Sequence, residues 1–278
     1  MLNHTVTRPT MRYLGGKWHL APWIIANFPA HRTYVEPFGG AASVLLRKQR
    51  VHAEILNDLD GEIVNLFRVL RNPIEGRELV RQVQGTPFAR HEYEAAFQPA
   101  GDPIEQARRT LIKAGMGFGS NSIHKRTGFR SGFTRNGQVP AGDWSGLPAA
   151  LSQIVERLRG VIIEERPAVH VIQQYDTVAT LHYIDPPYPH STRGDDSRYR
   201  CEMTDEEHRE LAGVLRGVKG MVVVSGYACD LYDAELYADW QRVERNTHAD
   251  GARDRVEVLW MSPNITAHQG GLFEEVTK

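Results

Sequence analysis

The sequence has little cysteine and no long apolar run. Its 278 residues include two cysteines, Cys201 and Cys229, which excludes a disulfide framework, and no Cys/His cluster has the spacing of a zinc site. No stretch approaches the roughly 18 apolar residues that a membrane-spanning helix needs. The polar segment Met1–Thr10 lacks the apolar core of a signal peptide. We therefore expect a soluble cytoplasmic protein with reduced thiols, no membrane contact and no bound metal.

The chain also lacks an excess of charge of either sign. Lys and Arg number 33, and Asp and Glu number 34, so the net charge is −1. This balance excludes a uniformly cationic nucleic-acid coat protein and a polybasic membrane binder. Hydrophobic residues make up 41% of the chain, which is ordinary for a globular protein with a buried core. The length suits one large α/β domain or a domain that carries an insertion.

Glycine turns alternate with apolar stretches in the first forty residues, and no internal repeat stands out along the chain. The pattern predicts strands at 33–36, 53–56, 161–163, 181–184, 221–225, around 243 and at 255–261. It predicts helices at 18–28, 41–46, 63–70, 147–158 and 169–175, and one that begins near Thr204 with Glu207 completing a capping box. The order favours an α/β fold with a mainly parallel, Rossmann-like sheet closed by an antiparallel C-terminal strand pair.

The regular pattern is interrupted after residue 71. Residues 72 to about 117 are polar and helical, with breaks at Pro87 and Pro99. Residues 117–142 are rich in Gly, Ser, Asn and Arg and have little periodicity. We therefore predict an inserted, mostly helical and loop-rich domain over residues 72–145. Residues 1–71 and 146–278 then form the main domain.

The segment Glu36-Pro37-Phe38-Gly39-Gly40 joins a strand end to a glycine turn and a helix. Glycines there let a ligand approach the backbone, and the helix presents its N-terminus to it. The order is not G-x-G-x-x-G, so a dinucleotide fits poorly, and a plain tight turn is the alternative. Asp58 follows the next strand, where a carboxylate can accept hydrogen bonds from the two hydroxyls of a ribose. The alternative for Asp58 is a helix N-cap before Gly61.

Asp185-Pro186-Pro187-Tyr188 directly follows the apolar strand at 181–184. The two prolines cannot donate backbone hydrogen bonds, so they end the strand in a rigid loop. Open α/β sheets bind ligands at this carboxyl edge. A carboxylate and a proline carbonyl can accept the two hydrogens of an amino group, and Tyr188 offers a face on which a ring can stack. The tetrapeptide thus indicates a site for an exocyclic amine on a planar heterocycle; a structural Pro-Pro turn is the alternative.

Five short segments follow one another along the chain. They are Arg12-Tyr13-Leu14-Gly15-Gly16-Lys17, Tyr34-Val35-Glu36-Pro37-Phe38-Gly39-Gly40, Asn57-Asp58, Asp185-Pro186-Pro187-Tyr188 and Glu257-Val258-Leu259-Trp260. Together they resemble the Dam-type DNA adenine methyltransferases in content and in order: cofactor motifs, a target-recognition insertion, then the catalytic tetrapeptide. The resemblance covers nearly the whole chain outside the insertion. It implies a class I methyltransferase sheet and a site-specific, S-adenosylmethionine-dependent enzyme.

The resemblance also implies a role for each matching residue. Phe38, Gly39 and Gly40 would wrap S-adenosylmethionine, Asp58 would hold its ribose, and Glu36 would face its methionine amino end. Many relatives have Trp where this chain has Tyr13. The implied cofactor residues are Tyr13, Lys17, Glu36, Phe38, Gly39, Gly40, Asp58 and Asp185. The implied catalytic residues are Asp185, Pro186, Pro187 and Tyr188; Asp185 anchors the target amine and Tyr188 stacks on the base.

The stretch from Gln106 to Gly142 contains no acidic residue. It holds seven cations, namely Arg108, Arg109, Lys113, Lys125, Arg126, Arg130 and Arg135. Cations neutralise phosphates and amides read base edges, so we predict a DNA-facing stretch with contacts from Arg126, Arg130, Arg135 and Asn136. Among these, Arg130 and Arg135 are the preferred contacts to bases or phosphates. The alternative is a solvated loop. A second basic cluster between His190 and Arg200 is either a lid over a flipped base or a surface loop.

The mechanism implied is direct methyl transfer to the exocyclic amine of adenine in double-stranded DNA, after the base is flipped out of the duplex. The protein would be a monomer when free, would act on a short recognition sequence, and would work in a prokaryotic or virus-infected cell. Two other functions remain open. The acceptor could be a cytosine amine, or an amide in protein or RNA, and the chain could be a DNA-binding regulator without methylation activity.

Overall fold

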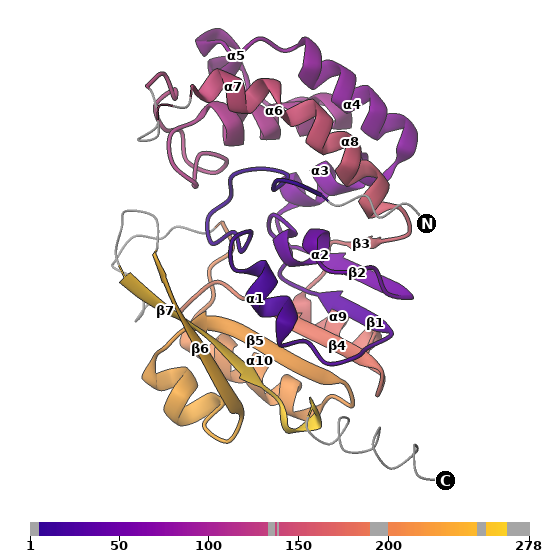
Figure 1. Ribbon diagram of the computed structural model, residues 1–278, viewed down its shortest axis with the longest axis vertical. Helices are drawn as coiled ribbons and strands as arrows, with labels where there is room; N and C mark the ends of the chain where they lie inside the picture. Colours follow the sequence, from indigo (N-terminus) through magenta and orange to yellow (C-terminus); the bar gives the residue numbers. More distant parts are fainter. Residues whose placement is uncertain (1–5, 133–136, 138, 190–199, 249–253, 266–278) are drawn as a thin grey trace. The chain divides into compact units, whose positions relative to one another are not determined.

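The computed structural model describes residues 6–132, 137, 139–189, 200–248 and 254–265 (Figure 1). The chain forms two compact units. The first comprises Met1–Pro22, Gly39–Gln49 and Asp58–Glu165, and the second comprises Trp23–Phe38, Arg50–Asn57 and Arg166–Lys278. In the described ranges, no helix is long and apolar enough to cross a bilayer.

The second unit is built on a mainly parallel sheet. Its strands are β1 (Thr33–Glu36), β2 (Ala53–Asn57), β4 (Thr180–Ile184), β5 (Met221–Tyr227), β6 (Gln241–His248) and β7 (Asp254–Met261). They lie in the order β2-β1-β4-β5-β7-β6. Pairing is parallel from β2 to β5, and β7 is antiparallel to both β5 and β6. The prediction of a mainly parallel sheet closed by an antiparallel C-terminal pair is confirmed.

Register places the functional segments at one edge of this sheet. Val35 on β1 lies opposite Ile55 on β2 and His182 on β4. Glu36 ends β1 and Asp185 follows β4, so the two predicted site residues are at the carboxyl ends of neighbouring parallel strands. This is the edge at which open α/β sheets bind ligands.

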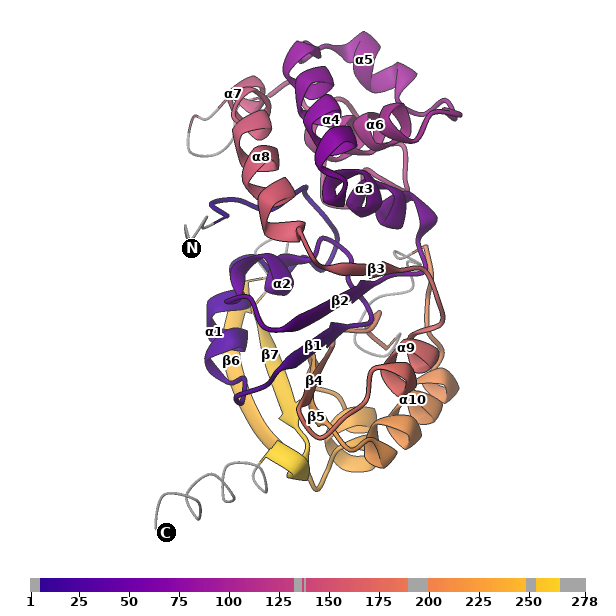
Figure 2. The same ribbon diagram turned by 90° about the vertical axis from the view of Figure 1, so that its right-hand side faces the viewer.

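Helices of the second unit cover the sheet, whose central strand β4 is buried along its whole length. All five residues of β4 are buried, as expected for a strand covered on both faces. Helices α9 (Ala168–Gln174) and α10 (Asp205–Gly217) lie on the same side of the sheet (Figure 2). Leu211 and Leu215 of α10 pack in one cluster with Val222 and Val224 of β5. On the other side, the ring of Phe28 lies 5.9 Å from Tyr34 and 5.7 Å from Tyr183.

The predicted capping box at the start of α10 is confirmed. Thr204 Oγ1 accepts a hydrogen bond from Glu207 N at 3.2 Å, and Glu207 Oε2 accepts one from Thr204 N at 2.7 Å. Two further elements were not predicted: the π-helix η2 (Leu231–Leu236) in this unit and helix α7 (Pro140–Ser145) in the first. The helix predicted at 18–28 is shorter and is α1 (Ala21–Ala26).

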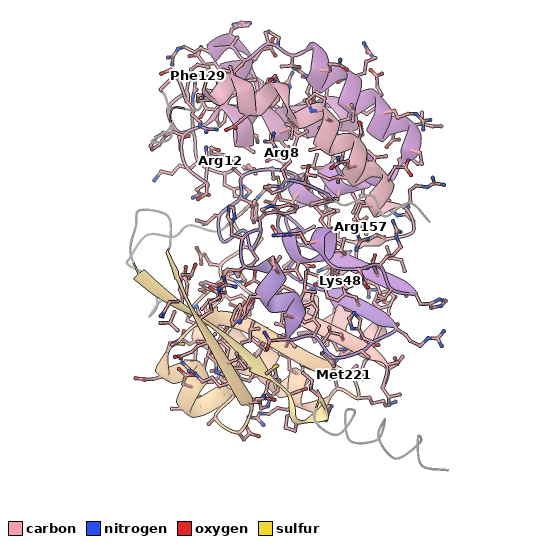
Figure 3. The ribbon with its side chains drawn as sticks, viewed as in Figure 1. Arg8, Arg12, Lys48, Phe129, Arg157 and Met221 are labelled. Carbon is pink, nitrogen blue, oxygen red and sulfur yellow. The ribbon has the colours of Figure 1, made fainter. Side chains whose placement is uncertain are left out.

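The first unit is mostly helical. It contains α2 (Ser43–Arg47), α3 (Gly61–Arg71), α4 (Pro73–Gly85), α5 (Arg90–Ala95), α6 (Pro103–Met116), α7, α8 (Leu147–Leu158) and the short strand β3 (Ile162–Glu164). Side chains of Asp60, Asn72 and Asp102 cap α3, α4 and α6. Buried Arg157 on α8 donates to the carbonyl of Leu45 on α2 (Figure 3).

The compact first unit is larger than the predicted insertion at residues 72–145. Helix α3 packs on α6, and α8 packs on α4, so both helices flanking the insertion share its core. The amphipathic pattern of α8 matches its predicted bounds of 147–158. The assignment of residues 72–145 to target recognition, as distinct from catalysis, stays a prediction.

Candidate active site

Asp58 is held by backbone amides beside the glycine loop of the first unit. Its Oδ2 accepts a hydrogen bond from Gly40 N at 2.7 Å, and its Oδ1 accepts one from Asp60 N at 2.9 Å. The residue that caps α3 is Asp60, which accepts from Glu62 N, so the alternative of Asp58 as the helix cap is wrong. Burial raises the pKa of the Asp58 carboxyl, and the backbone hydrogen bonds oppose that shift.

Tyr13 and Gly40 fit closely together. Gly40 has φ +47°, and a Cβ added to it would lie 2.8 Å from Tyr13 Cε1, so only glycine fits. Lys17 is buried, and its Nζ donates to the carbonyl of Gly15 at 3.1 Å. Gly39 accepts a hydrogen bond from Ala42 N through its carbonyl at 2.7 Å. We call Tyr13, Lys17, Gly39, Gly40 and Asp58 the predicted cofactor residues of the first unit.

Two further predicted cofactor residues belong to the second unit. Glu36 is 2% exposed and accepts a hydrogen bond from the Tyr34 hydroxyl at 2.8 Å. Burial and then the adjacent Glu36 raise the pKa of Tyr34 well above its ordinary value, so the phenol stays a donor. Phe38 packs against the apolar cluster that contains Ile184 at the end of β4.

Asp185 is held in place from the neighbouring strand β5. Ser225 Oγ donates to Asp185 Oδ1 at 2.9 Å, and the Tyr183 hydroxyl lies 2.9 Å from the same Ser225 oxygen. Burial, followed by the charge of Asp185, raises the pKa of Tyr183 well above its ordinary value. Ser225 was not identified from the sequence. The signal was available, since Ser225 ends the apolar run of the strand next to the tetrapeptide.

Tyr188 is fixed by residues of strands β5 and β7. It is 4% exposed, its hydroxyl donates to Glu257 Oε1 on β7 at 2.8 Å, and its ring lies edge-on to Tyr227 at 4.6 Å between centroids. Pro186 is buried and Pro187 is half-buried between these two anchored residues. Glu257 was recognised only as part of a motif, and Tyr227 was not identified from the sequence.

The residues of the first unit fit S-adenosylmethionine chemically. A carboxylate offers about four lone-pair positions. Asp58 uses two of these for backbone amides, which leaves acceptor capacity on both oxygens for ribose hydroxyls. Among the described residues, no group of three His, Cys, Asp or Glu side chains is arranged to hold a metal ion.

The predicted DNA contacts differ in their surroundings. Arg126 is exposed, and its guanidinium lies 5.4 Å from the ring centroid of Phe97. Arg130 is ion-paired, with Nη2 3.0 Å from Asp143 Oδ2. Arg135 and Asn136, together with the cluster at 190–199, lie outside the described residues.

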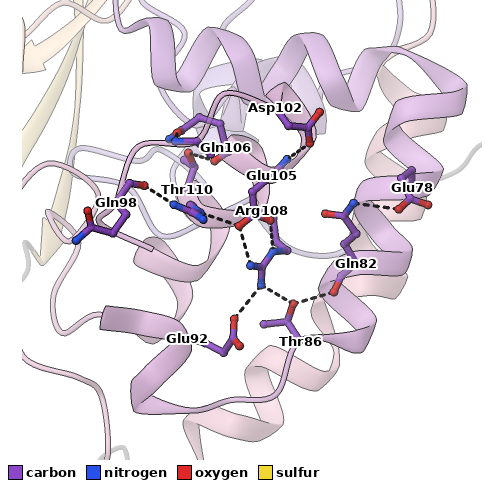
Figure 4. A network of polar contacts seen from close by, with 12 residues as sticks. Glu78, Gln82, Thr86, Glu92, Gln98, Asp102, Glu105, Gln106, Arg108 and Thr110 are labelled. Atoms are coloured by element: carbon purple, nitrogen blue, oxygen red, sulfur yellow. Dashed lines mark hydrogen bonds and ion pairs between the residues drawn. The ribbon is translucent and has the colours of Figure 1, made fainter. Parts of the chain in front are cut away.

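Acids from outside the acid-free stretch form ion pairs with several of its cations. Arg108 pairs with Glu105 at 2.6 Å and with Glu92 at 2.9 Å (Figure 4). Arg109 pairs with the same Glu105 at 2.7 Å. Lys113 forms a buried ion pair with Glu62. Four of the seven cations, Arg108, Arg109, Lys113 and Arg130, therefore have carboxylate partners, and the DNA-facing role of the stretch stays a prediction.

The fold and these segments define a class of protein. A mainly parallel sheet with a C-terminal antiparallel pair, a glycine loop after β1 and an acid after β4 is consistent with a Rossmann-like methyltransferase. The model of the D12 class N6 adenine-specific DNA methyltransferases matches residues 13–248, and the chain belongs to this family. It is an adenine-specific DNA methyltransferase, as the resemblance implied.

Two individual proteins are similar to most of the chain, and a third is similar to a shorter part of it. The type II methyltransferase M.CviBI of Paramecium bursaria Chlorella virus NC1A is 24% identical over 248 residues, which span 86% of this chain and 91% of that protein. The DNA adenine methylase of Escherichia coli K12 is 24% identical over 221 residues, 76% of each chain. The DNA adenine methylase of Serratia marcescens is 34% identical over 64 residues, 23% of each chain.

Proposed function

We propose that this protein transfers a methyl group from S-adenosylmethionine to the exocyclic amine of adenine within a short sequence of double-stranded DNA. The observation that carries the proposal is the anchoring of Asp185 by Ser225 at the carboxyl end of β4, directly before two prolines. A carboxylate fixed there, next to a proline carbonyl, is an acceptor pair for an amino group on a planar ring.

S-adenosylmethionine, when bound, supplies an activated methyl group, so no covalent enzyme intermediate is needed. The protein's contribution is orientation. Asp185 and the carbonyl of Pro186 accept the two amine hydrogens and direct the nitrogen lone pair. Tyr188 stacks on the base, and its hydrogen bond to Glu257 fixes where that base lies. Pro187 keeps the loop between these two groups rigid.

The predicted cofactor residues hold S-adenosylmethionine. Asp58 accepts hydrogen bonds from the ribose hydroxyls, and the glycine loop allows close approach through Gly39 and Gly40. Tyr13 and Phe38 supply apolar surface. The charges of Lys17 and Glu36 bind the amino-acid end, Lys17 the carboxylate and Glu36 the ammonium group.

The target adenine must leave the duplex, because its amine is inaccessible within the base stack. Flipping costs a few kcal/mol of unstacking, which DNA contacts from the insertion offset. Arg126, Arg130, Arg135 and Asn136 are the proposed contacts. The protein then works as a monomer at the DNA of its cell or infected host cell; sedimentation with and without duplex DNA tests the oligomeric state.

Substitution of the anchoring carboxylate tests the proposal. Asp185→Ala should reduce methyl transfer to background while DNA binding stays measurable, because the acceptor pair is lost and the insertion is untouched. The measurement is labelled S-adenosylmethionine incubated with DNA, digestion to nucleosides, and a parallel mobility-shift assay. Asp239→Ala is the matched control, since Asp239 forms an exposed pair with Arg216. Near-normal turnover by Asp185→Ala would overturn the assignment.

The identity of the labelled nucleoside tests the acceptor. Methyladenosine is the expected product. Methylcytidine would move the reaction to the cytosine amine, and DNA binding without any labelled nucleoside would reduce the protein to a DNA-binding regulator. Sequencing that maps methylated adenines in DNA from an expressing host then gives the recognition sequence.

A further inference from the structure

His124 lies where the predicted DNA-facing loop meets the predicted cofactor residues of the first unit. Its Nε2 lies 3.2 Å from Asp60 Oδ2, and its ring lies edge-on to Tyr13 with 6.2 Å between centroids. The His124 and Asp60 side chains are only 15% and 3% exposed. A histidine from the insertion therefore contacts two segments that carry predicted cofactor contacts.

The loop that carries His124, residues 117–130, has a fixed base. Phe118 N donates to Gly128 O at 2.9 Å, and Arg130 N donates to Met116 O at 2.7 Å. A Cβ on Gly117 would lie 2.4 Å from the Cβ of Ser122, so the turn packs against its own start. Because the base of the loop is closed and packed, we expect a displacement of its exposed residues to move its buried residues as well.

The C-terminal part of the loop is anchored to α5. The Tyr93 hydroxyl donates to the carbonyl of Thr127 at 2.8 Å. The Phe129 ring lies 6.0 Å from that of Tyr93 and 5.1 Å from that of Phe88 (Figure 3). Exposed Arg126, a proposed DNA contact, is thus two residues from His124 on a loop held at both ends.

Asp60 connects His124 to the ribose-binding carboxylate. Its backbone N–H donates to Asp58 Oδ1 at 2.9 Å, and its Oδ1 accepts from Glu62 N at 3.0 Å, which caps α3. Asp58 in turn accepts from Gly40 N at 2.7 Å. A change at the Asp60 carboxylate therefore acts on the backbone that positions Asp58.

Tyr13 provides a second connection. Its ring lies against His124 on one side and fills the space over Gly40 on another, where an added Cβ would be 2.8 Å away. The two connections converge on Gly40: one runs through Asp60 and Asp58, and the other through Tyr13. All of these contacts are within the first unit.

We propose that His124 is a positioning residue that couples DNA contact at the loop 117–130 to cofactor affinity. When DNA binds Arg126, it fixes the loop in the position in which His124 contacts Asp60 and Tyr13. These contacts order the cofactor residues before S-adenosylmethionine binds. Binding linkage is reciprocal, so the cofactor strengthens DNA binding by the same factor. This inference rests on the proposed function for its two ligands.

The test is the affinity for S-adenosylhomocysteine, an unreactive probe of the cofactor site, with and without sheared genomic DNA that lacks adenine methylation. Isothermal titration of the full-length protein should give a wild-type affinity at least about fivefold higher with DNA. His124→Ala should reduce that ratio to less than about twofold. A histidine that serves only as packing would instead lower affinity equally in both conditions and leave the ratio unchanged, which would overturn the proposal.

A second variant tests the route through Asp60. Asp60→Ser keeps a side chain that caps helices well but removes the carboxylate facing His124. It should lower the DNA-dependent ratio, and the double variant should lower it no further than His124→Ala alone. His91→Ala, an exposed histidine on α5, is the matched control and should keep the wild-type ratio. If the double variant lowers the DNA-dependent affinity ratio by the sum of the two single effects, His124 does not act through Asp60.

The outcome separates this inference from the proposed function. If the wild-type protein binds S-adenosylhomocysteine more tightly with DNA but yields no labelled nucleoside, the proposed methyltransferase function is overturned and the coupling stands. A wild-type protein that methylates adenine but binds the probe equally with and without DNA would keep the function and overturn the coupling.

Discussion

Gly40 has a left-handed backbone and lies directly under the ring of Tyr13. The glycine was predicted from a turn after a strand, and its partner Tyr13 from a motif 27 positions earlier in the chain. Only the fold brings the two into contact. The roles of Asp58 and Asp60 are likewise decided by the fold, because both carboxylates precede α3 in the sequence. In the structure, Asp60 caps α3, and Asp58 accepts the hydrogen bond from the backbone amide of Gly40 in the glycine loop.

Gly40→Ala should weaken cofactor binding through two effects, the strain of the left-handed backbone and the displacement of the Tyr13 ring. A non-glycine residue in the left-handed region costs about 1–2 kcal/mol, and here the added methyl also displaces Tyr13. Calorimetric titration with S-adenosylhomocysteine measures the loss. Gly137→Ala is the matched control, because Gly137 has φ +73° but nothing within 4 Å of the added Cβ. Equal affinities for the two variants would show that Tyr13 does not contribute to the site.

Helices α3 and α6 illustrate what can be predicted for an element. The amphipathic pattern and the caps of both helices are local, as is the proline in the first turn of α6, so the sequence indicates both helices. Their mutual packing is not local. Lys113 on α6 forms a buried ion pair with Glu62 on α3, and Thr110 Oγ1 donates to the same Glu62 carboxylate at 2.9 Å. From the sequence, Lys113 is one more cation in a basic stretch.

Lys113→Met should destabilise the first unit by about 3–5 kcal/mol, because it leaves the Glu62 charge buried without its partner. Urea unfolding followed by circular dichroism measures the change. The double variant Lys113→Met/Glu62→Gln should recover most of the loss, since no uncompensated charge remains. Arg81→Met, which breaks an exposed pair with Glu78 on α4, should have little effect. A Lys113→Met variant as stable as the wild type would show that the pair is not buried in solution.

Across the whole molecule, charge is distributed differently in space than along the chain. The stretch from 106 to 142 has no acidic residue, but Glu105 precedes it and Asp143 follows it. Both of these acids fold back onto its arginines. Arg126, exposed beside the ring of Phe97, is a better candidate for a phosphate contact than Arg130, which already has a carboxylate partner.

The salt dependence of DNA binding tests this ranking. Arg126→Gln should lower the slope of log affinity against log salt by about 0.9, the value for one phosphate contact. Arg130→Gln should lower it less, because Asp143 already neutralises that guanidinium. The slope from titrations of a fluorescent duplex is the measurement, with Arg81→Gln as the control on α4. The slope could stay unchanged both for Arg126→Gln and for the triple variant in which Arg126, Arg130 and Arg135 are all replaced by Gln. That result would show that the DNA interface lies elsewhere on the protein.

The sequence by itself determined the strand and helix pattern, the glycine loop and the tetrapeptide after β4, because strand periodicity, capping and turn chemistry act over a few residues. Tertiary structure decided the partners. Ser225 holds Asp185, Glu257 holds Tyr188, and Glu62 neutralises Lys113, each from an element distant in the chain. Hydrogen bonds and ion pairs depend on distances of about 3 Å in space, and chain separation carries no information about those distances until the sheet and helices are packed.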